Sequence, residues 1–410
     1  MLSEKTKKII LVVGFLTSIV VIGGLLYYLF LKPTTPTVNV STEGTEVTTG
    51  TGDLPTAGVG QPTTGVVTTP NATGALPAVS EVASGGITKT TVLTTSSVEA
   101  VTLSKNGDGM NYYDPQDGRF YTIDSDGNVV KLSNKQFPDV ENVAWNADGE
   151  KAVIEFPDGS NVVYDFTSET QVTLPKHWED FEFSPVKDQI AAKSMGIDSS
   201  NRSLVISNSD GSQVMAVQAL GDNADKVQVN QSPTDQIIAF SDTADSMGLG
   251  QKMILAIGKN QENFKGLVVE GLGFESLWSP RGDVLLYSVY GDTSNWKPML
   301  WIVNGSANSL GDDRRSLSLY TWAEKCVFAS STVVYCAVPQ EMENNAGMLK
   351  STYAVSPDDL YKIDLTNNRS SLVARPEIGT PMTNLQVSGD GKYLFYTNNL
   401  NGRLEMIKLK

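Results

Sequence analysis

The sequence predicts an all-β fold, a β-propeller, from Ile87 to the C-terminus, and three observations support this. Short runs of β-branched and aromatic residues follow one another, separated by Asp-Gly, Asn-Gly and Ser-Pro turns. No amphipathic helical stretch of convincing length interrupts them. One pattern recurs along the region: an apolar run, a tight turn and a second apolar run.

The recurring pattern sets the expected number of blades. Its clear copies are AWNADGEKAVIEF (Ala144–Phe156), FEFSPVKDQIAAKS (Phe181–Ser194), VNQSPTDQIIAFSD (Val229–Asp242), SLWSPRGDVLLYSV (Ser276–Val289) and LQVSGDGKYLFYTN (Leu385–Asn398). Weaker copies begin at Val101 and Cys326. The equivalent turn positions are Ser104, Asn146, Ser184, Ser232, Ser279, Ser330 and Ser388, at spacings of 38 to 58 residues. A four-stranded blade takes about 40–50 residues, which favours seven blades over six.

The hairpins carry a family resemblance. A Ser-Pro-x-x-Asp hairpin, followed by a strand, a variable loop and a strand pair, resembles the TolB-type, WD40-like propeller repeat. TolB-type propellers are typically six-bladed, and the Trp-Asp and Gly-His signatures of WD40 repeats are absent here. The resemblance implies binding and scaffolding at membranes or cell envelopes, with no catalytic motif to carry over.

A long apolar run lies near the N-terminus. Ile9–Leu31 contains no charged residue and would cover roughly 34 Å as a helix, enough for a hydrocarbon core of about 30 Å. Lysines cluster before it, at Lys5, Lys7 and Lys8. The positive flank predicts a cytoplasmic tail (residues 1–8), an uncleaved single-pass signal anchor and an extracytoplasmic C-terminal domain.

Between the anchor and the propeller, residues 32–86 are rich in Thr, Pro and Gly, without aromatic residues. Such a segment buries too little apolar surface to order itself, so we expect a disordered stalk, open to glycosylation. The Thr-rich stalk, scarce cysteine and repeat type suggest a bacterial envelope.

Composition excludes several classes of function. The net charge is −15, which disfavours nucleic acid as a partner. One histidine (His177) and two cysteines cannot build a His-rich metal site or a four-cysteine zinc site, so no metal or cofactor is expected. The sequence lacks nucleophile and phosphate-loop motifs, and no catalytic residue is assigned. We therefore expect a non-enzyme; the alternative is an extracytoplasmic propeller hydrolase or lyase acting on glycans or peptides.

Several motifs that resemble functional sites are interpreted as turns. Asp124-Ser-Asp126-Gly-Asn128 resembles half a calcium loop, but Lys135 occupies the required acidic position, so a hairpin turn is expected. The Arg281-Gly282-Asp283 tripeptide falls where other units place a hairpin turn. The repeated aspartates are expected to cap turns by accepting backbone N–H groups: Asp188, Asp235, Asp283 and Asp390.

Two long-range pairings are expected. The last unit has three strands, so Thr88–Thr95 is predicted to supply its outer strand beside Arg403–Leu409 and close the ring. Cys326 and Cys336 flank a turn near Ser331 at equal distances. An antiparallel hairpin would place them opposite one another, which predicts a disulfide, with two free thiols as the alternative.

The expected function is binding to a protein partner of unknown identity. If the strands of a blade are A to D from the axis outward, the B–C loops and blade connections share one face. These loops are long in four successive units: Met195–Arg202, Thr243–Gln251, Tyr290–Pro298 and Pro339–Tyr353. They carry residue types suited to interface anchors: Tyr290, Trp296, Met342, Met348 and Tyr353. Trp296 is the expected principal anchor, although loop tolerance alone would also explain the lengths. A structural role in a larger envelope complex is a further alternative.

Overall fold

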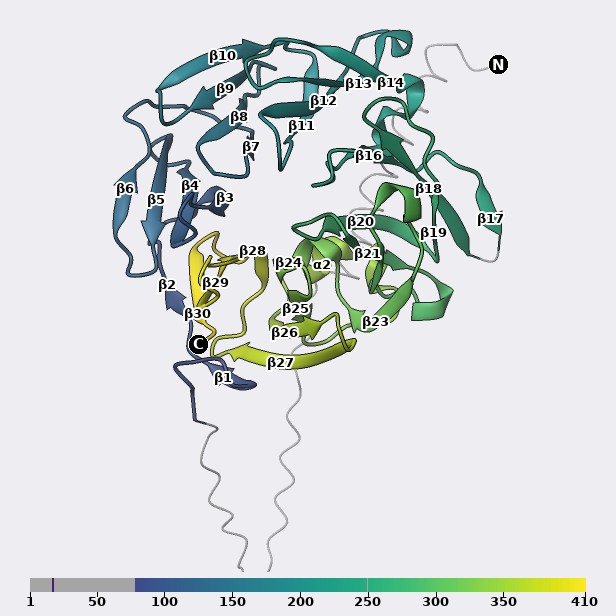
Figure 1. Ribbon diagram of the computed structural model, residues 1–410. Coiled ribbons are helices and arrows are strands. Elements are labelled where there is room, and N and C mark those ends of the chain that lie inside the picture. Colours follow the sequence, from purple (N-terminus) through teal and green to yellow (C-terminus); the bar gives the residue numbers. More distant parts are fainter. Residues whose placement is uncertain (1–16, 18–77, 249) are drawn as a thin grey trace, which may run out of the picture. The chain divides into compact units, whose positions relative to one another are not determined.

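The computed structural model describes Thr17 and residues 78–248 and 250–410. All of these except Thr17 lie in a compact unit, Thr73–Lys410. Its strands form seven separate sheets around a central axis (Figure 1), so the predicted all-β propeller with seven blades is confirmed. Apart from Thr17, the predicted anchor Ile9–Leu31 and the stalk up to residue 77 lie outside the described residues. In the part of the chain that is described, no helix is long and apolar enough to cross a membrane.

The first three blades are regular four-stranded antiparallel sheets whose strands run in chain order from the axis outward. Blade 1 consists of β3 (Glu99–Leu103), β4 (Gly109–Asp114), β5 (Arg119–Asp124) and β6 (Val129–Lys131). Blade 2 consists of β7 (Asn142–Trp145), β8 (Lys151–Glu155), β9 (Asn161–Asp165) and β10 (Thr170–Leu174). Blade 3 consists of β11 (Trp178–Phe183), β12 (Gln189–Ser194), β13 (Ser203–Asn208) and β14 (Met215–Ala219).

Of the later blades, blades 4 and 6 carry a fifth strand, and blades 5 and 7 have four. Blade 4 consists of β15 (Val227–Val229), β16 (Ile237–Ser241), β17 (Ser246–Gly248), β18 (Gln251–Gly258) and β19 (Leu267–Val269). Blade 5 consists of β20 (Leu272–Trp278), β21 (Val284–Tyr290), β22 (Met299–Asn304) and β23 (Arg315–Tyr320). Blade 6 consists of β24 (Cys326–Ser330), β25 (Val333–Pro339), β26 (Asp358–Asp364), β27 (Arg369–Pro376) and β1 (Gly86–Thr88). Blade 7 consists of β28 (Met382–Val387), β29 (Tyr393–Asn398), β30 (Leu404–Lys408) and β2 (Thr91–Val92).

Short helices occupy the connections. They are the 3-10 helices η2 (Ser199–Asn201), η3 (Gly221–Lys226), η4 (Asp292–Ser294), η5 (Ala307–Ser309), η6 (Ala323–Lys325) and η7 (Ala346–Met348), and the single turn α2 (Lys350–Tyr353). The four long B–C loops lie where the sequence places them. The loop of blade 4 also contains the strand β17, and the loop of blade 6 contains η7 and α2.

The core lies between blades. Each apolar cluster is shared by neighbouring sheets, as where Phe240 of blade 4 packs with Tyr287 of blade 5. The ring closes in the same way, because Met110 of blade 1 packs with Phe395 and Leu404 of blade 7. One sheet alone could not bury both of its faces, but in the ring each of the seven sheets is covered on both faces by its neighbours.

The first and last parts of the domain are joined by strands. β2 pairs antiparallel with β30, Thr91 opposite Met406, so the predicted closure is confirmed for Thr91–Val92. The predicted strand was too long at its start, because Thr88 belongs to β1 and pairs parallel with β27 of blade 6. It was too long at its end because Thr94 Oγ1 accepts the Leu404 N–H, 3.0 Å away, and donates to Ser96 as the chain turns toward blade 1.

The hairpin turns owe their shape to the equivalent positions found in the sequence. The side chains of Ser104, Asn146, Ser279 and Ser388 each accept the N–H of the residue that begins or precedes the second strand. Asp124 likewise accepts the N–H groups of Asp126 and Asn128, so that motif is a hairpin turn, as predicted.

The predicted role of the turn aspartates is right for Asp390 and wrong for the other three. Asp390 accepts the Lys392 N–H at 3.0 Å. Asp188 and Asp235 instead form ion pairs that link blades, and Asp283 binds Ser279 Oγ and Arg281 within its own turn. In both cases a lysine of the preceding blade binds the carboxylate: Lys151 binds Asp188, and Lys187 binds Asp235.

Candidate functional site

The two faces of the ring differ in loop length. We call the face formed by the B–C loops and the blade connections the long-loop face, and the face formed by the A–B and C–D turns the short-turn face. The long-loop face exposes eight large apolar side chains: Ile197, Met247, Leu272, Met348, Leu349, Val355, Ile378 and Leu400. The turns of the short-turn face expose only two in the described chain, Val186 and Val214. Clustered exposed apolar groups commonly mark interaction surfaces.

An apolar pocket opens on the long-loop face between blades 4 and 5. Its volume is about 260 Å³, and it is lined by Ser246, Gly250, Gln251, Lys252, Gly271, Leu272, Tyr290, Gly291, Asp292 and Trp296. It is smaller than the roughly 300–1,000 Å³ typical of small-molecule sites. The pocket therefore suits a single large apolar side chain better than a separate ligand. Two residues predicted as anchors, Tyr290 and Trp296, meet in its wall.

The loop that carries Trp296 is held in an uncommon conformation. Asn295 and Trp296 both have left-handed backbone angles, with φ of 53° and 59°. Such a conformation is costly for a bulky residue and persists only where surrounding contacts enforce it. Here the Trp296 N–H donates to Gly291 O at 2.8 Å, and the Gly347 N–H donates to Trp296 O at 2.8 Å. The loop of blade 6 thus fixes the loop of blade 5.

Tyr290 is as much a structural residue as a surface one. Its ring lies 6.3 Å from the Trp296 ring, centroid to centroid, and packs against the backbone of Gly347. A Cβ at Gly347 would lie 2.3 Å from Tyr290 Cγ, so only glycine fits there. Substituting Tyr290 would disturb two loops at once.

The other predicted anchors are distributed differently. Met348 is 55% exposed and follows Gly347, whose N–H donates to Trp296 O. Tyr353 packs on Trp322, with ring centroids 6.1 Å apart, and its hydroxyl accepts the Glu343 N–H. Tyr353 therefore stabilises its own loop, and Met342 is half-buried in the same loop. The sequence-based assignment considered only B–C loops and therefore missed Leu272, the first residue of β20, where the chain enters blade 5.

Lys350, Glu275 and Glu324 form a charged cluster beneath the loops of the long-loop face. Lys350 Nζ, on α2, binds Glu275 of β20 and also Glu324 of η6, at 2.7 Å. Burial raises the pKa of the Glu275 carboxyl, and Lys350 opposes that rise. The cluster ties the loop of blade 6 to the inner strand of blade 5.

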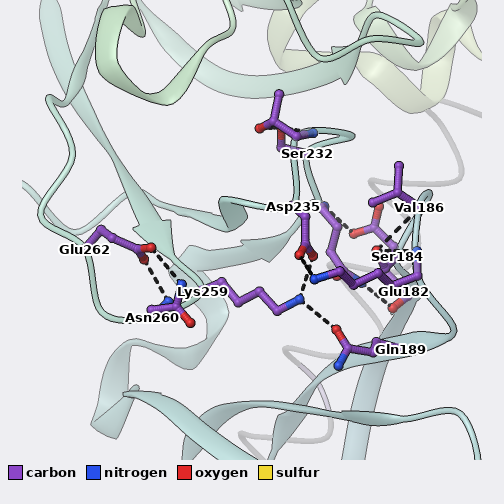
Figure 2. Close-up of polar contacts among 12 residues, drawn as sticks. Glu182, Ser184, Val186, Gln189, Ser232, Asp235, Lys259, Asn260 and Glu262 are labelled. Carbon is purple, nitrogen blue, oxygen red and sulfur yellow. Dashed lines mark hydrogen bonds and ion pairs between the residues drawn. The ribbon is translucent and has the colours of Figure 1, made fainter.

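The short-turn face carries links between blades, and Figure 2 shows those between blades 3 and 4. Lys259 Nζ donates to Gln189 Oε1 of blade 3 at 2.7 Å and to Asp235 Oδ1 of its own blade at 2.5 Å. Lys187 of blade 3 also binds Asp235. Burial would raise the pKa of Asp235, but these two lysines outweigh it and lower the pKa. These groups satisfy one another's charge and hydrogen-bonding capacity. Elsewhere on this face, the turns of blades 1 to 3 line a more polar pocket of about 500 Å³.

Cys326 and Cys336 lie opposite one another on β24 and β25 and form a disulfide. Both are buried in the cluster between blades 5 and 6.

No protein-family model matches the sequence, and no curated protein is similar to it. Solved structures are similar in fold. Oligogalacturonate lyase in complex with manganese matches with a TM-score of 0.54 and 12% identity, over 78% of this chain and 93% of the lyase. The β-propeller domain of Myceliophteria thermophila Cps50 (Swd1) matches with a TM-score of 0.51 and 12% identity, over 78% of this chain and all of that domain.

The chain is a seven-bladed β-propeller. TolB from Acinetobacter baumannii matches with a TM-score of only 0.42, at 14% identity over 66% of this chain and 65% of TolB. That score carries no argument, so the propeller is established and closer kinship with TolB is not.

The expectation that the chain is not an enzyme requires correction. It rested on missing motifs, and oligogalacturonate lyase shows that an enzyme can use the same fold. At this low identity the likeness concerns the fold alone, and it does not decide between a binding module and an enzyme.

Proposed function

We propose that the protein is a membrane-anchored, extracytoplasmic propeller that binds a protein partner through its long-loop face. The observation that carries the proposal is the apolar pocket beside Trp296, which is lined by the exposed Leu272 and lies on a face with further exposed apolar side chains. Interface hot spots are typically aromatic residues at the centre of a water-excluding patch. The energetic cost of the left-handed Trp296 supports a role beyond packing.

The location of the binding face can be tested by photo-crosslinking. A photoreactive amino acid in place of Leu272, 46% exposed at the pocket, should capture the partner in cells. The same substitution at Val186, 55% exposed on the short-turn face, is the matched control. Equal capture from both positions would contradict the proposal.

With the partner in hand, Trp296→Ala should weaken binding by at least about 2 kcal/mol, because a central aromatic anchor is lost. The thermal midpoint should change little, since Trp296 is only half-buried. Titration calorimetry measures the affinity. Unchanged affinity, or an equal loss from Val186→Ser, would reject Trp296 as the anchor.

The anchor is proposed from the uncharged run Ile9–Leu31. Deleting residues 1–31 should move the protein from the membrane fraction to the soluble fraction, since that run is the only one long enough to span a bilayer. Fractionation followed by immunoblotting measures the change. Membrane retention of the shortened chain, after a high-salt wash, would contradict a single-pass anchor.

A further inference from the structure

The lysines around the pocket are already engaged. Lys252 Nζ lies 2.5 Å from Asp242, and Lys350 is shared by Glu275 and Glu324. Lys297 Nζ lies over the ring of Tyr320, 5.5 Å from its centroid. The three ion pairs offset the positive charges of Lys252 and Lys350, whereas Lys297 has no ion-pair partner among residues 78–248 and 250–410.

The carboxylates around the pocket are less engaged. Asp292 lines the pocket and Asp245 precedes the lining residue Ser246; both are exposed. Glu341 and Glu343 are exposed in the loop whose Asn345 N–H donates to Asn295 O at 3.0 Å. None of these four acids has an ion-pair partner among residues 78–248 and 250–410. The four unpaired carboxylates outnumber Lys297, so the loops that meet at the apolar pocket carry an excess of negative charge.

The geometry points to the chemistry of the partner: we propose that the pocket receives an apolar side chain from a cationic segment of the partner protein. This rests on the proposed function and identifies the kind of chain that the long-loop face selects. The pocket supplies the desolvated anchor contact, and the surrounding carboxylates attract lysine or arginine residues on either side of that anchor. The same field repels acidic chains, including other copies of this acidic protein.

Two synthetic peptides with the same Leu-Trp-Leu centre test the proposal, one flanked by four lysines and the other by four glutamates. Binding to the full chain is measured by fluorescence anisotropy at low and high salt. The cationic peptide should bind at least about tenfold tighter at low salt, and its advantage should shrink at high salt.

Three variants separate anchor from charge. Trp296→Ala should strongly weaken binding of the cationic peptide. The pair Asp245→Asn with Asp292→Asn should reduce its advantage over the acidic peptide several-fold. The matched pair Asp126→Asn with Asp148→Asn makes the same charge change in exposed turns of the short-turn face, and should have little effect.

The outcomes distinguish this inference from the proposed function. If both peptides bind equally and both depend on Trp296, the cationic partner is ruled out while the binding face stands. If the cationic advantage survives Trp296→Ala, or falls equally in the two neutralised pairs, the attraction is diffuse and the inference fails. Absence of binding by either peptide at millimolar concentration also overturns it.

Discussion

Glu182 lies on the inner strand of blade 3 and faces blade 4. Its half-buried carboxylate accepts the Gln231 N–H at 3.0 Å, and its backbone oxygen accepts the Gln231 side-chain amide at 2.7 Å. Burial raises the pKa of Glu182 to about 7, and the Gln231 N–H opposes that rise. Because the folded pKa exceeds that of an unfolded glutamate, about 4.3, ionised Glu182 destabilises the native state.

Glu182→Gln should therefore stabilise the domain at pH 8 by about 1–3 kcal/mol and make little difference at pH 4. The wild type loses this stability as pH rises from about 4.3 to about 7, and the variant does not titrate. Urea denaturation at both pH values measures the difference.

Glu179→Gln is the control for this prediction, because Glu179 lies on the same strand but is exposed. It should show no such pH-dependent gain. An identical stability difference at pH 4 and pH 8 in Glu182→Gln would contradict the assigned pKa.

Individual side chains were predictable from sequence only where their partners are local. Asp390 and Asp124 bind backbone groups within a few residues, and both were interpreted correctly as turn residues. Asp235 pairs with Lys187 and Lys259, which approach only after two blades have packed together. Trp296 could be assigned to a loop, but its pocket depends on Leu272 and Gly347 from other segments.

At the scale of elements, β2 has a role that its two residues do not suggest. It is the only strand that joins the start of the described domain to β30, and the Leu93 N–H extends the pairing to Leu404 O at 2.9 Å. Apart from β1 and β2, each outer strand of a blade pairs with a strand that is close to it in the sequence.

Leu93→Pro removes that N–H and should destabilise the domain more than Leu132→Pro, by about 1 kcal/mol or more. Leu132 is a matched control because it is also half-buried and its N–H donates to Phe120 O at 3.0 Å within blade 1. The control loses a bond inside one blade, whereas Leu93→Pro weakens the closure of the ring. Chemical denaturation measures the free energy of unfolding of both variants. Equal losses would show that closure of the ring adds no stability beyond that of a bond within one blade.

Elements were predictable where the hairpin signature was strong. Ser104, Asn146, Ser279 and Ser388 repeat because one side-chain acceptor shapes each turn, and that chemistry is visible in sequence. β1 could not be anticipated, since its parallel partner β27 lies almost 300 residues away and nothing local specifies the pairing. β17 was hidden for a different reason: it is a short hairpin extension of β18 inside a polar loop.

For the whole molecule, seven blades follow from counting turn positions, and the structure has that number. The two weak units, at Val101 and Cys326, were both needed, because without either one the count would have been six. Blade 6 lacks the usual turn sequence but has a disulfide between the strands of that hairpin. Function was less accessible, because a ring of repeats specifies its own packing and leaves recognition to loops of individual sequence.

The strand pairing at the start of the domain also determines how the ring would carry mechanical load. Tension on the preceding chain would first meet the bonds of the segment that contains Ala83, Gly85 and β1, which bind Lys408, Val373 and β27. Only after this segment peels away would force reach β2, whose pairing with β30 closes the ring. We therefore expect a pulling force on the preceding chain to detach the segment around β1 before it opens the ring at β2.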